Sequence, residues 1–270
     1  MIEMIEDGKK FALSDLTSAE FRQLIPCRPI ILLPLGSQED QGAHAPMGDY
    51  RLAEMVAWHI AVSANSSGIL TLAAPTLPFG AADHFGAIAG GMALRPSIFR
   101  EVLVDLLDEL LRHGLTRIII FNGHGGNVPI IHEVTVGVRR KGGPIIPSFY
   151  LWKVAQVLMQ RLCRVNEGAF GHGGEPLTSI SLWLRREAVR PDLWVSPEPA
   201  GRFLDLPIAG FGCVDFEGIP IDVPVEYDQV APNSAFADAK EAKADIGHAI
   251  VDELVKFGVR FCAHMATVSK

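Results

Sequence analysis

Apolar positions follow two different spacings along the first half of the chain. Short runs that are apolar at almost every position are typical of strands buried on both faces of a parallel sheet. Longer segments with apolar residues three or four positions apart are typical of amphipathic helices. The pattern predicts strands at 29–35, 68–75, 116–121 and 143–151, and helices at 50–64, 96–114 and 128–140.

The segment 96–114 gives the clearest helical signal. Its apolar residues form one stripe from Phe99 to Leu111, so one face is expected to lie on the core. Serine often caps the first turn of a helix, and glycine often follows the last. We therefore expect Ser97 to cap this helix and Gly114 to end it.

Strands that alternate with helices indicate βαβ units and an α/β fold with a mostly parallel central sheet. The second half of the chain is less regular. A loop entering a helix is expected at 171–189, short or irregular elements at 190–234, and a long amphipathic terminal helix at 234–258. Since no repeat, low-complexity tract or linker interrupts the pattern, residues 1–270 are expected to form one domain.

Composition narrows the class of protein. Of the 270 residues, 49% are hydrophobic, enough for a full core, and the formal net charge is −7. An acidic chain has no electrostatic basis for binding nucleic acid or an anionic membrane, and no apolar run is long enough to span a bilayer. The polar start of the chain does not resemble a signal peptide, so a cytoplasmic protein with four buried thiols is expected.

Three glycine-rich loops gather histidines and carboxylates. GSQEDQGAHAPMGDY, at 36–50, follows the first predicted strand, and NGHGGN, at 122–127, follows the third. GHGGE, at 171–175, comes later in the chain. The carboxyl ends of parallel strands meet at one edge of a sheet, where α/β proteins bind ligands. The first two loops can therefore converge on one site.

These loops predict a divalent-metal site. A mixture of oxygen and imidazole ligands suits Zn²⁺, Mn²⁺ or Fe²⁺. In a catalytic site of this kind, the ion lowers the pKa of a bound water toward about 7. The candidate ligands are Glu39, His44, Asp49, His124 and Glu175.

Most of these residues also have a structural interpretation. Asp49 precedes the predicted helix 50–64 and is a common capping residue, a role compatible with metal binding. His124 can be a hydrogen-bonded turn residue, and Glu39 can stabilise the amino terminus of a helix. Three aromatic residues that could line a pocket are more typical of the core: Trp152, Trp183 and Phe85.

The order of these motifs resembles the creatininase family, also called creatinine amidohydrolases. GSQEDQGAHAPMGD resembles the family's first motif, NGHGGN matches its third intact, and HGGEPLTS resembles its fourth. Between them, FGAADHFGAIAGGMAL resembles a further block and places Asp83 and His84 beside the site. The blocks match in order and spacing over about residues 28–185, and residues 234–254 resemble the family's last helix.

The resemblance implies a three-layer α/β/α fold and a homo-oligomer, commonly a hexamer. It implies a site with one or two divalent ions, Zn²⁺ or Mn²⁺, that opens a cyclic amide or a related C–N bond of a small-molecule substrate. Glu39 and His124 match ligands of the first metal. Glu175 matches the glutamate of the fourth motif, and His172 matches its histidine, a candidate proton carrier.

The chain departs from the family pattern at three positions. Gln41 stands where the family has a histidine ligand of its second metal, and His44 could be recruited instead. Asp49 lies one position before the family's aspartate, where this chain has Tyr50. Leu177 replaces a second glutamate. A site with a single metal, or with an altered second one, is therefore compatible with this sequence.

The leading hypothesis is a metal-dependent hydrolase acting on a small cyclic amide or related C–N bond. One alternative keeps the metal and opens a cyclic ketone of polyol or inositol catabolism at a C–C bond. Another is a non-catalytic binding or assembly protein derived from the enzyme. The catalytic candidates are His172, Glu175 and His84. The candidates for substrate contact, including backbone N–H groups that can meet an oxyanion, are Gln41, Asp83, Gly125, Gly126 and Asn127.

Overall fold

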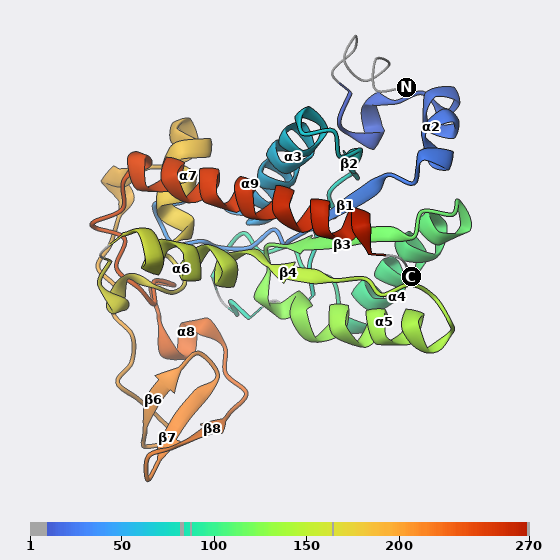
Figure 1. The fold of residues 1–270 in the computed structure, drawn as a ribbon. Helices are drawn as coiled ribbons and strands as arrows, with labels where there is room; N and C mark the ends of the chain where they lie inside the picture. Colours follow the sequence, from blue (N-terminus) through green and yellow to red (C-terminus); the bar gives the residue numbers. More distant parts are fainter. Residues whose placement is uncertain (1–9, 82–83, 87, 164, 269–270) are drawn as a thin grey trace.

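The computed structural model describes residues 10–81, 84–86, 88–163 and 165–268. Its central sheet has four parallel strands in the order β2-β1-β3-β4 (Figure 1). These strands are β1 (Ile30–Leu35), β2 (Thr71–Ala73), β3 (Arg117–Asn122) and β4 (Ser148–Tyr150). The prediction of a mostly parallel central sheet is confirmed.

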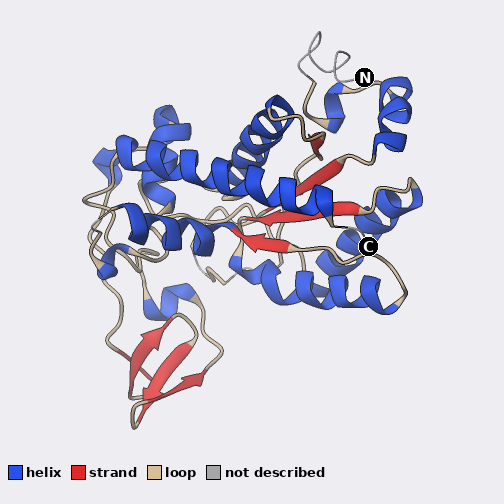
Figure 2. Cartoon of the chain, viewed as in Figure 1, coloured by secondary structure: helices blue, strands red, loops and turns tan. Residues whose placement is uncertain are grey.

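Helices cover both faces of this sheet (Figures 1 and 2). The helices are α2 (Ser18–Leu24), α3 (Tyr50–Ser66), α4 (Pro96–Arg112), α5 (Val128–Arg140), α6 (Leu151–Leu162), α7 (Leu177–Leu184), α8 (Tyr227–Val230) and α9 (Ala244–Thr267). Helices α3, α6, α7 and α9 pack on one face, and α2, α4 and α5 pack on the other. The three-layer α/β/α fold is therefore confirmed.

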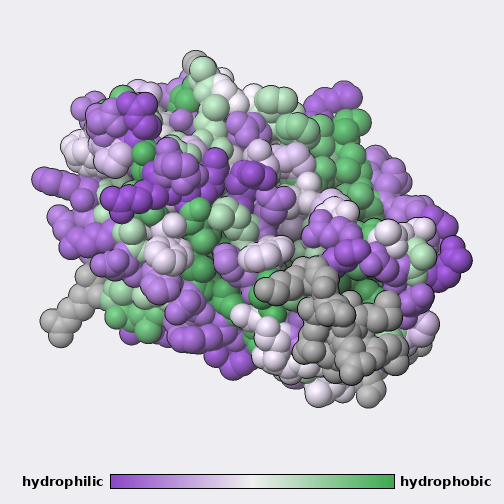
Figure 3. Space-filling view, turned by 90° about the horizontal axis from the view of Figure 1, so that it is seen from above, coloured by the Kyte–Doolittle hydropathy of each residue, from purple (hydrophilic) through white to green (hydrophobic). Residues whose placement is uncertain are grey.

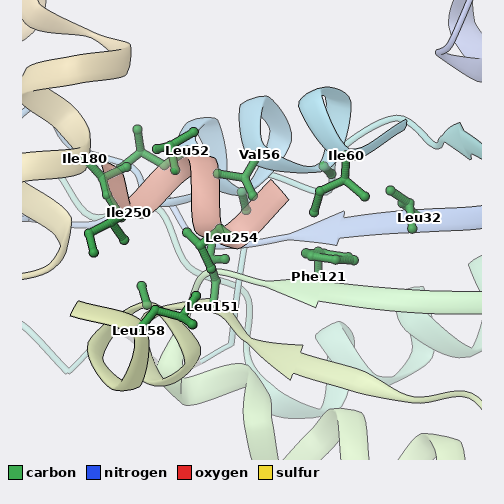
Figure 4. Packing of buried hydrophobic residues seen from close by; sticks show 14 of the residues in the cluster. Leu32, Leu52, Val56, Ile60, Phe121, Leu151, Leu158, Ile180, Ile250 and Leu254 are labelled. Atoms are coloured by element: carbon green, nitrogen blue, oxygen red, sulfur yellow. The ribbon is translucent and has the colours of Figure 1, made fainter. Parts of the chain in front are cut away.

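Successive residues of β1 supply the two cores, because side chains in a strand alternate between faces. Ile30 and Leu32 belong to the cluster under α3 and α9, whereas Ile31 and Leu33 belong to the cluster under α4 and α5. Figure 4 shows the first cluster, in which side chains from β1, β3, α3, α6, α7 and α9 meet. Burial on both faces explains why this strand is apolar at every position.

A second, antiparallel sheet projects from the body of the molecule (Figures 1 and 2). Its strands, in order, are β5 (Arg202–Phe203), β6 (Leu206–Gly210), β7 (Cys213–Phe216) and β8 (Ile219–Asp222). The strands are short, as expected for 190–234, but they form an antiparallel meander with an irregular register between Ile208 and Gly210. Every residue of β8 is exposed, whereas β6 alternates between half-buried and exposed positions and β7 buries Val214.

Several predicted boundaries differ from the structure. The strand expected at 143–151 is only three residues long and runs directly into α6, a helix that the sequence analysis missed. The terminal helix begins at Ala244, not at 234. Ser97 does not cap α4, because that helix already starts at Pro96 after Arg95. Gly114 does follow the helix, with a φ of 78° that favours glycine.

The helices and the cysteines of the described part of the chain bear on two expectations from composition. None of its helices combines the length and apolar character needed to cross a bilayer. Figure 3 shows a face on which hydrophilic residues are widely spread, with hydrophobic ones between them. Cys262 is buried as expected, but Cys27, Cys163 and Cys213 are only half-buried, which corrects the prediction of four buried thiols.

Candidate metal centre and active-site pocket

The loop between β1 and α3 carries two of the predicted ligands, Glu39 and Asp49. Asp49 directly precedes α3, but its side chain makes no capping hydrogen bond to the helix. Its Oδ1 instead accepts a hydrogen bond from the backbone N–H of Ser37 at 2.7 Å. This bond ties the end of the loop to its start and leaves Oδ2 to face His124. The capping interpretation of Asp49 is therefore wrong.

The loop after β3 carries His124. Strands β1 and β3 are parallel neighbours, with Leu35 paired with Asn122, so their loops leave the sheet side by side. The Asn122 side chain accepts the backbone N–H of His124 at 3.1 Å and donates to its carbonyl at 2.6 Å. The hydrogen bonds of Asn122 thus fix the loop conformation from which the imidazole reaches the first loop.

Glu39, Asp49 and His124 form a compact cluster of candidate metal ligands. One ligand atom from each lies within 4.8 Å of the others, and all three residues are buried. His124 Nδ1 lies 2.8 Å from Glu39 Oε2 and 3.6 Å from Asp49 Oδ2. Among the residues that the structure describes, His44 and Glu175 are not part of this cluster.

The tautomer of His124 indicates that the cluster fits a cation. His124 Nε2 lies 2.9 Å from the carbonyl oxygen of Ala81, which can only accept, so Nε2 carries the proton. In the neutral ring, Nδ1 then presents a lone pair to two carboxylates. Although Glu39 is close, Nδ1 is buried without a hydrogen bond of good geometry to any described residue. A lone pair and two carboxylates that converge in a buried site repel one another unless a positive charge lies between them.

Without a metal, protons supply that charge. Burial, together with the negative charge of Asp49, raises the pKa of Glu39 to about 8. Burial alone would lower the pKa of His124, but its contacts with Asp49 and Glu39 outweigh burial and raise it to about 11. The three side chains therefore form a donor set of oxygen and imidazole ligands that suits a divalent ion such as Zn²⁺ or Mn²⁺.

A cavity of about 400 Å³ opens onto this cluster. Glu39 and Asp49 form part of its wall, together with His172 and Glu175 from the third loop. Gln41, from the first loop, also lines the cavity. The other side chains in its wall come from outside the three loops: Tyr150, Trp152, Lys153, Gln156, Pro176, Leu177 and Tyr227. The structure thus brings the metal-ligand cluster and the proposed proton carriers to one pocket.

Glu175 faces the pocket but is held by α7. Its carboxylate accepts hydrogen bonds from the backbone N–H and the hydroxyl of Ser179. Burial raises the pKa of Glu175, and the bonds from Ser179 oppose that shift. His44 is directed elsewhere: its Nε2 lies 3.1 Å from the hydroxyl of Thr178. These contacts explain why neither residue joins the metal-ligand cluster.

His172 is positioned by an acidic partner and by two aromatic rings. Its Nε2 lies 3.3 Å from Asp40 Oδ1. Its ring packs against Phe85 and Tyr227, with centroid distances of 4.7 and 4.8 Å. Burial would raise the pKa of Asp40, but hydrogen bonds from His172, Ser234 and Gly42 lower it, so Asp40 is anionic. An Asp–His pair of this kind can hold an imidazole in one orientation.

The predicted substrate-contact residues have different surroundings. Gln41 lines the cavity and donates from Nε2 to Glu39 Oε1 at 3.1 Å. Gly126 lies so close to Ala81 and the His124 ring that a side chain would collide with them. Asn127 is fully buried. Its side-chain amide accepts a hydrogen bond from the backbone N–H of Ala81 and donates to the Gly36 carbonyl and to Asn122 Oδ1, which connects three loops.

Two further predicted residues come from the segment after residue 80. The His84 ring packs edge-on against Phe211, and its carbonyl accepts the backbone N–H of Tyr227 at 2.6 Å. Asp83 lies outside the described residues. The segment therefore approaches the pocket wall at Tyr227.

Sequence reasoning missed residues on α6 and α8. Tyr150, at the end of β4, and Lys153, in α6, line the pocket because α6 begins at its edge, and that helix was not predicted. Trp152 also lines the pocket, although the sequence analysis considered it more typical of the core. The Trp152 indole N–H donates to the carbonyl of Gly123, which anchors α6 to the His124 loop. The apolar spacing of Leu151, Ala155, Leu158 and Met159 is a helical signal that could have located α6. No local signal marks Tyr227.

The fold and the pocket define a class: an α/β enzyme with a candidate metal site at the carboxyl edge of its sheet. The chain belongs to the creatininase family, because the family model described as creatinine amidohydrolase matches residues 14–262. The relatives of known activity are hydrolases, and this protein is a hydrolase of that family.

These relatives act on different substrates. The chain is 31% identical to a mycofactocin precursor peptide peptidase of Mycobacterium tuberculosis over 206 residues, 73% of each chain. It is 27% identical to a 3-dehydro-scyllo-inosose hydrolase of Thermotoga maritima, over 89% of this chain and 80% of that one. It is also 27% identical to a creatinine amidohydrolase of Pseudomonas putida, over 92% and 95% of the two chains.

Solved structures share the fold. A crystal structure of creatinine amidohydrolase superposes with a TM-score of 0.76 at 23% identity, covering 97% of this chain and 100% of that one. Other creatininase structures with this fold include an Mn form and a mutant of Zn-Zn type. At this level of identity, the likeness establishes the architecture alone.

Proposed function

We propose that this protein is a divalent-metal-dependent amidohydrolase that cleaves a small cyclic amide or a related C–N bond. One observation carries the proposal: Glu39, Asp49 and His124 converge at a cavity that also contains His172 and Glu175. Two of the named relatives, the creatinine amidohydrolase and the peptide peptidase, support C–N cleavage by their names.

The metal would be held by Glu39 and Asp49 through carboxylate oxygens and by His124 through Nδ1. Zn²⁺ or Mn²⁺ suits this donor set and agrees with the forms seen in related structures. When bound, such an ion supplies a Lewis acid that polarises a carbonyl and makes water nucleophilic near neutral pH. Ala81 holds Nε2 of His124 and keeps Nδ1 directed at the cluster.

Proton transfer would be carried out by His172. Asp40 holds its Nε2, which leaves Nδ1 to take a proton from the nucleophile and return it to the leaving nitrogen. Glu175 is a second proton carrier in the same wall, since burial raises the pKa of its carboxyl. Backbone N–H groups of Gly125 and Gly126 are proposed to approach the substrate carbonyl oxygen, next to His124.

The proposal is tested by metal analysis joined to a substrate panel. We expect purified protein to contain divalent metal and to hydrolyse at least one cyclic amide, formamide or short peptide. Replacing His124 by alanine is expected to remove both metal and turnover while the circular dichroism spectrum stays unchanged. His132→Ala is the matched control, because His132 is exposed on α5, and it is expected to change neither. Full metal content in the His124→Ala variant would contradict the ligand assignment.

A second candidate keeps the metal and changes the bond. The inosose hydrolase matches 89% of this chain, so opening of a cyclic ketone at a C–C bond has a specific relative in its favour. Adding oxidised inositols to the same panel separates the two reactions. Turnover of an oxidised inositol alone would replace the amidohydrolase proposal. Ligand binding without turnover at full metal loading would instead favour a non-catalytic protein.

A further inference from the structure

We infer that the metal centre holds one ion rather than two, and that the Gln41 amide prevents a second ion from binding beside Glu39. The inference rests on the proposed metal centre and concerns its stoichiometry. In this respect the chain would differ from a solved mutant creatininase of the same fold, which is of Zn-Zn type. Among the residues that the structure describes, the donor atoms around Glu39 and Asp49 suffice for one ion only.

Gln41 occupies the side of Glu39 that is turned away from His124. Glu39 Oε2 faces His124 Nδ1, and Glu39 Oε1 accepts a hydrogen bond from Gln41 Nε2 at 3.1 Å. The NH₂ group of an amide only donates, so the atom that faces Oε1 cannot bind a cation. Gln41 is only 3% exposed. Turning its amide would break this hydrogen bond inside a buried site.

The other candidate ligands are already engaged. His44 is paired with Thr178 and does not belong to the cluster. Glu175 accepts both the backbone N–H and the hydroxyl of Ser179. Moving the Glu175 carboxylate toward a second ion would leave these two buried donors unsatisfied. Leu177, which also lines the cavity, has no ligand atom.

Charge balance leads to the same stoichiometry. The cluster consists of two carboxylates and one imidazole that is neutral when it binds a metal. One divalent ion neutralises the two carboxylates. A second divalent ion would add two positive charges, and the further carboxylate in the cavity wall, Glu175, is held by Ser179.

Metal titration of the purified full-length protein tests the inference. The metal-depleted protein is titrated with Mn²⁺ or Zn²⁺, and bound metal is counted by calorimetry and elemental analysis. We expect one equivalent per chain. Mn²⁺-loaded protein should give the electron paramagnetic resonance spectrum of an isolated ion. Two equivalents, or a spin-coupled pair, would overturn the inference and leave the proposed function standing; no bound metal would overturn both.

Substitution of Gln41 tests its specific role. Gln41→His replaces the donating amide by an imidazole that can bind a cation, so a second equivalent and a spin-coupled Mn²⁺ pair are expected. Gln41→Ala removes the amide without adding a ligand and is expected to keep one equivalent. Both variants are compared with the parent by thermal unfolding, so that loss of the fold is recognised. A single equivalent in a folded Gln41→His variant would overturn the role given to Gln41.

Discussion

Two residues of the candidate metal centre take up protons when no ion is bound. Burial and the charge of Asp49 raise the pKa of Glu39 to about 8. Burial lowers the pKa of His124, but its contacts with the two carboxylates outweigh burial and raise that pKa to about 11. Each of these groups must lose its proton before it can bind a metal. Protons and metal ions therefore compete for the same site.

Metal binding is accordingly expected to release protons and to strengthen as the pH rises. Both pKa values lie above neutrality, so between about pH 6 and pH 8 each displaced proton weakens binding by about tenfold for every unit of lowered pH. Calorimetry in buffers of different ionisation enthalpy counts the released protons. An affinity that stays constant over this range, with no proton release, would contradict the proposed ligands.

The pair formed by Asp40 and His172 supports a second prediction at this scale. Asp40→Asn keeps the shape of the side chain but removes the negative charge that faces His172 Nε2. We expect kcat to fall by about 10- to 100-fold, as for other partners that orient a functional histidine, with a smaller change in KM and a shifted pH profile. Asp108→Asn, on the exposed face of α4, is the matched control. Equal kcat values and pH profiles in the two variants would exclude a role for Asp40.

At the scale of elements, the contact between helices α7 and α9 determines where the Glu175 side chain lies. Gly247, in α9, lies against the backbone carbonyl of Ser179, and a methyl group there would overlap it. Ser179 in turn holds the Glu175 carboxylate. A small residue in the terminal helix thus lets α7 come close enough to fix a side chain of the pocket.

Gly247→Ala is therefore expected to destabilise the protein by about 1–3 kcal/mol, because the overlap is with backbone and cannot be relieved by rotating a side chain. Turnover should fall as well, since Glu175 would be displaced. Gly137→Ala is the control: Gly137 lies inside α5 with open space around it, so alanine should stabilise by up to about 1 kcal/mol. Chemical denaturation measures both changes. A Gly247→Ala variant as stable as the parent would show that the helices can separate at no cost.

At the scale of the whole molecule, we expect the fold to be independent of the candidate metal centre. Two apolar cores cover the opposite faces of the parallel sheet, and neither includes Glu39, Asp49 or His124. The three candidate ligands lie beyond the carboxyl ends of β1 and β3. The protein should therefore stay folded when the ion is removed.

Removal of the metal by a chelator is expected to leave the circular dichroism spectrum unchanged and to lower Tm. An ion present at a hundred times its Kd stabilises the folded state by about 2.7 kcal/mol, which for a chain of this size corresponds to about 5–10 °C. Restoring the ion should restore Tm. Loss of secondary structure on chelation would mean that the ion is part of the folding unit.

The local sequence pattern determined the layers of the molecule and the loops that carry chemistry. Buried strands must be apolar and helices must present an apolar stripe, so β1, β3, α4 and α5 were visible from spacing alone. The glycine-rich motifs likewise indicated the family before any coordinates. The sheet β5–β8 was not predicted, because its strands are only two to five residues long, too short for a clear period.

Only the tertiary structure decided which of the candidate ligands meet. Sequence alone left Asp49 between a capping role and a metal role, and left His44 and Glu175 as equal candidates for the centre. The bond from Ser37 turns Asp49 toward His124, while Thr178 and Ser179 hold His44 and Glu175 away from it. Periodicity is a local property that a short window of sequence contains. The meeting of side chains depends on hydrogen bonds between residues far apart in the chain, and only the folded molecule brings those residues together.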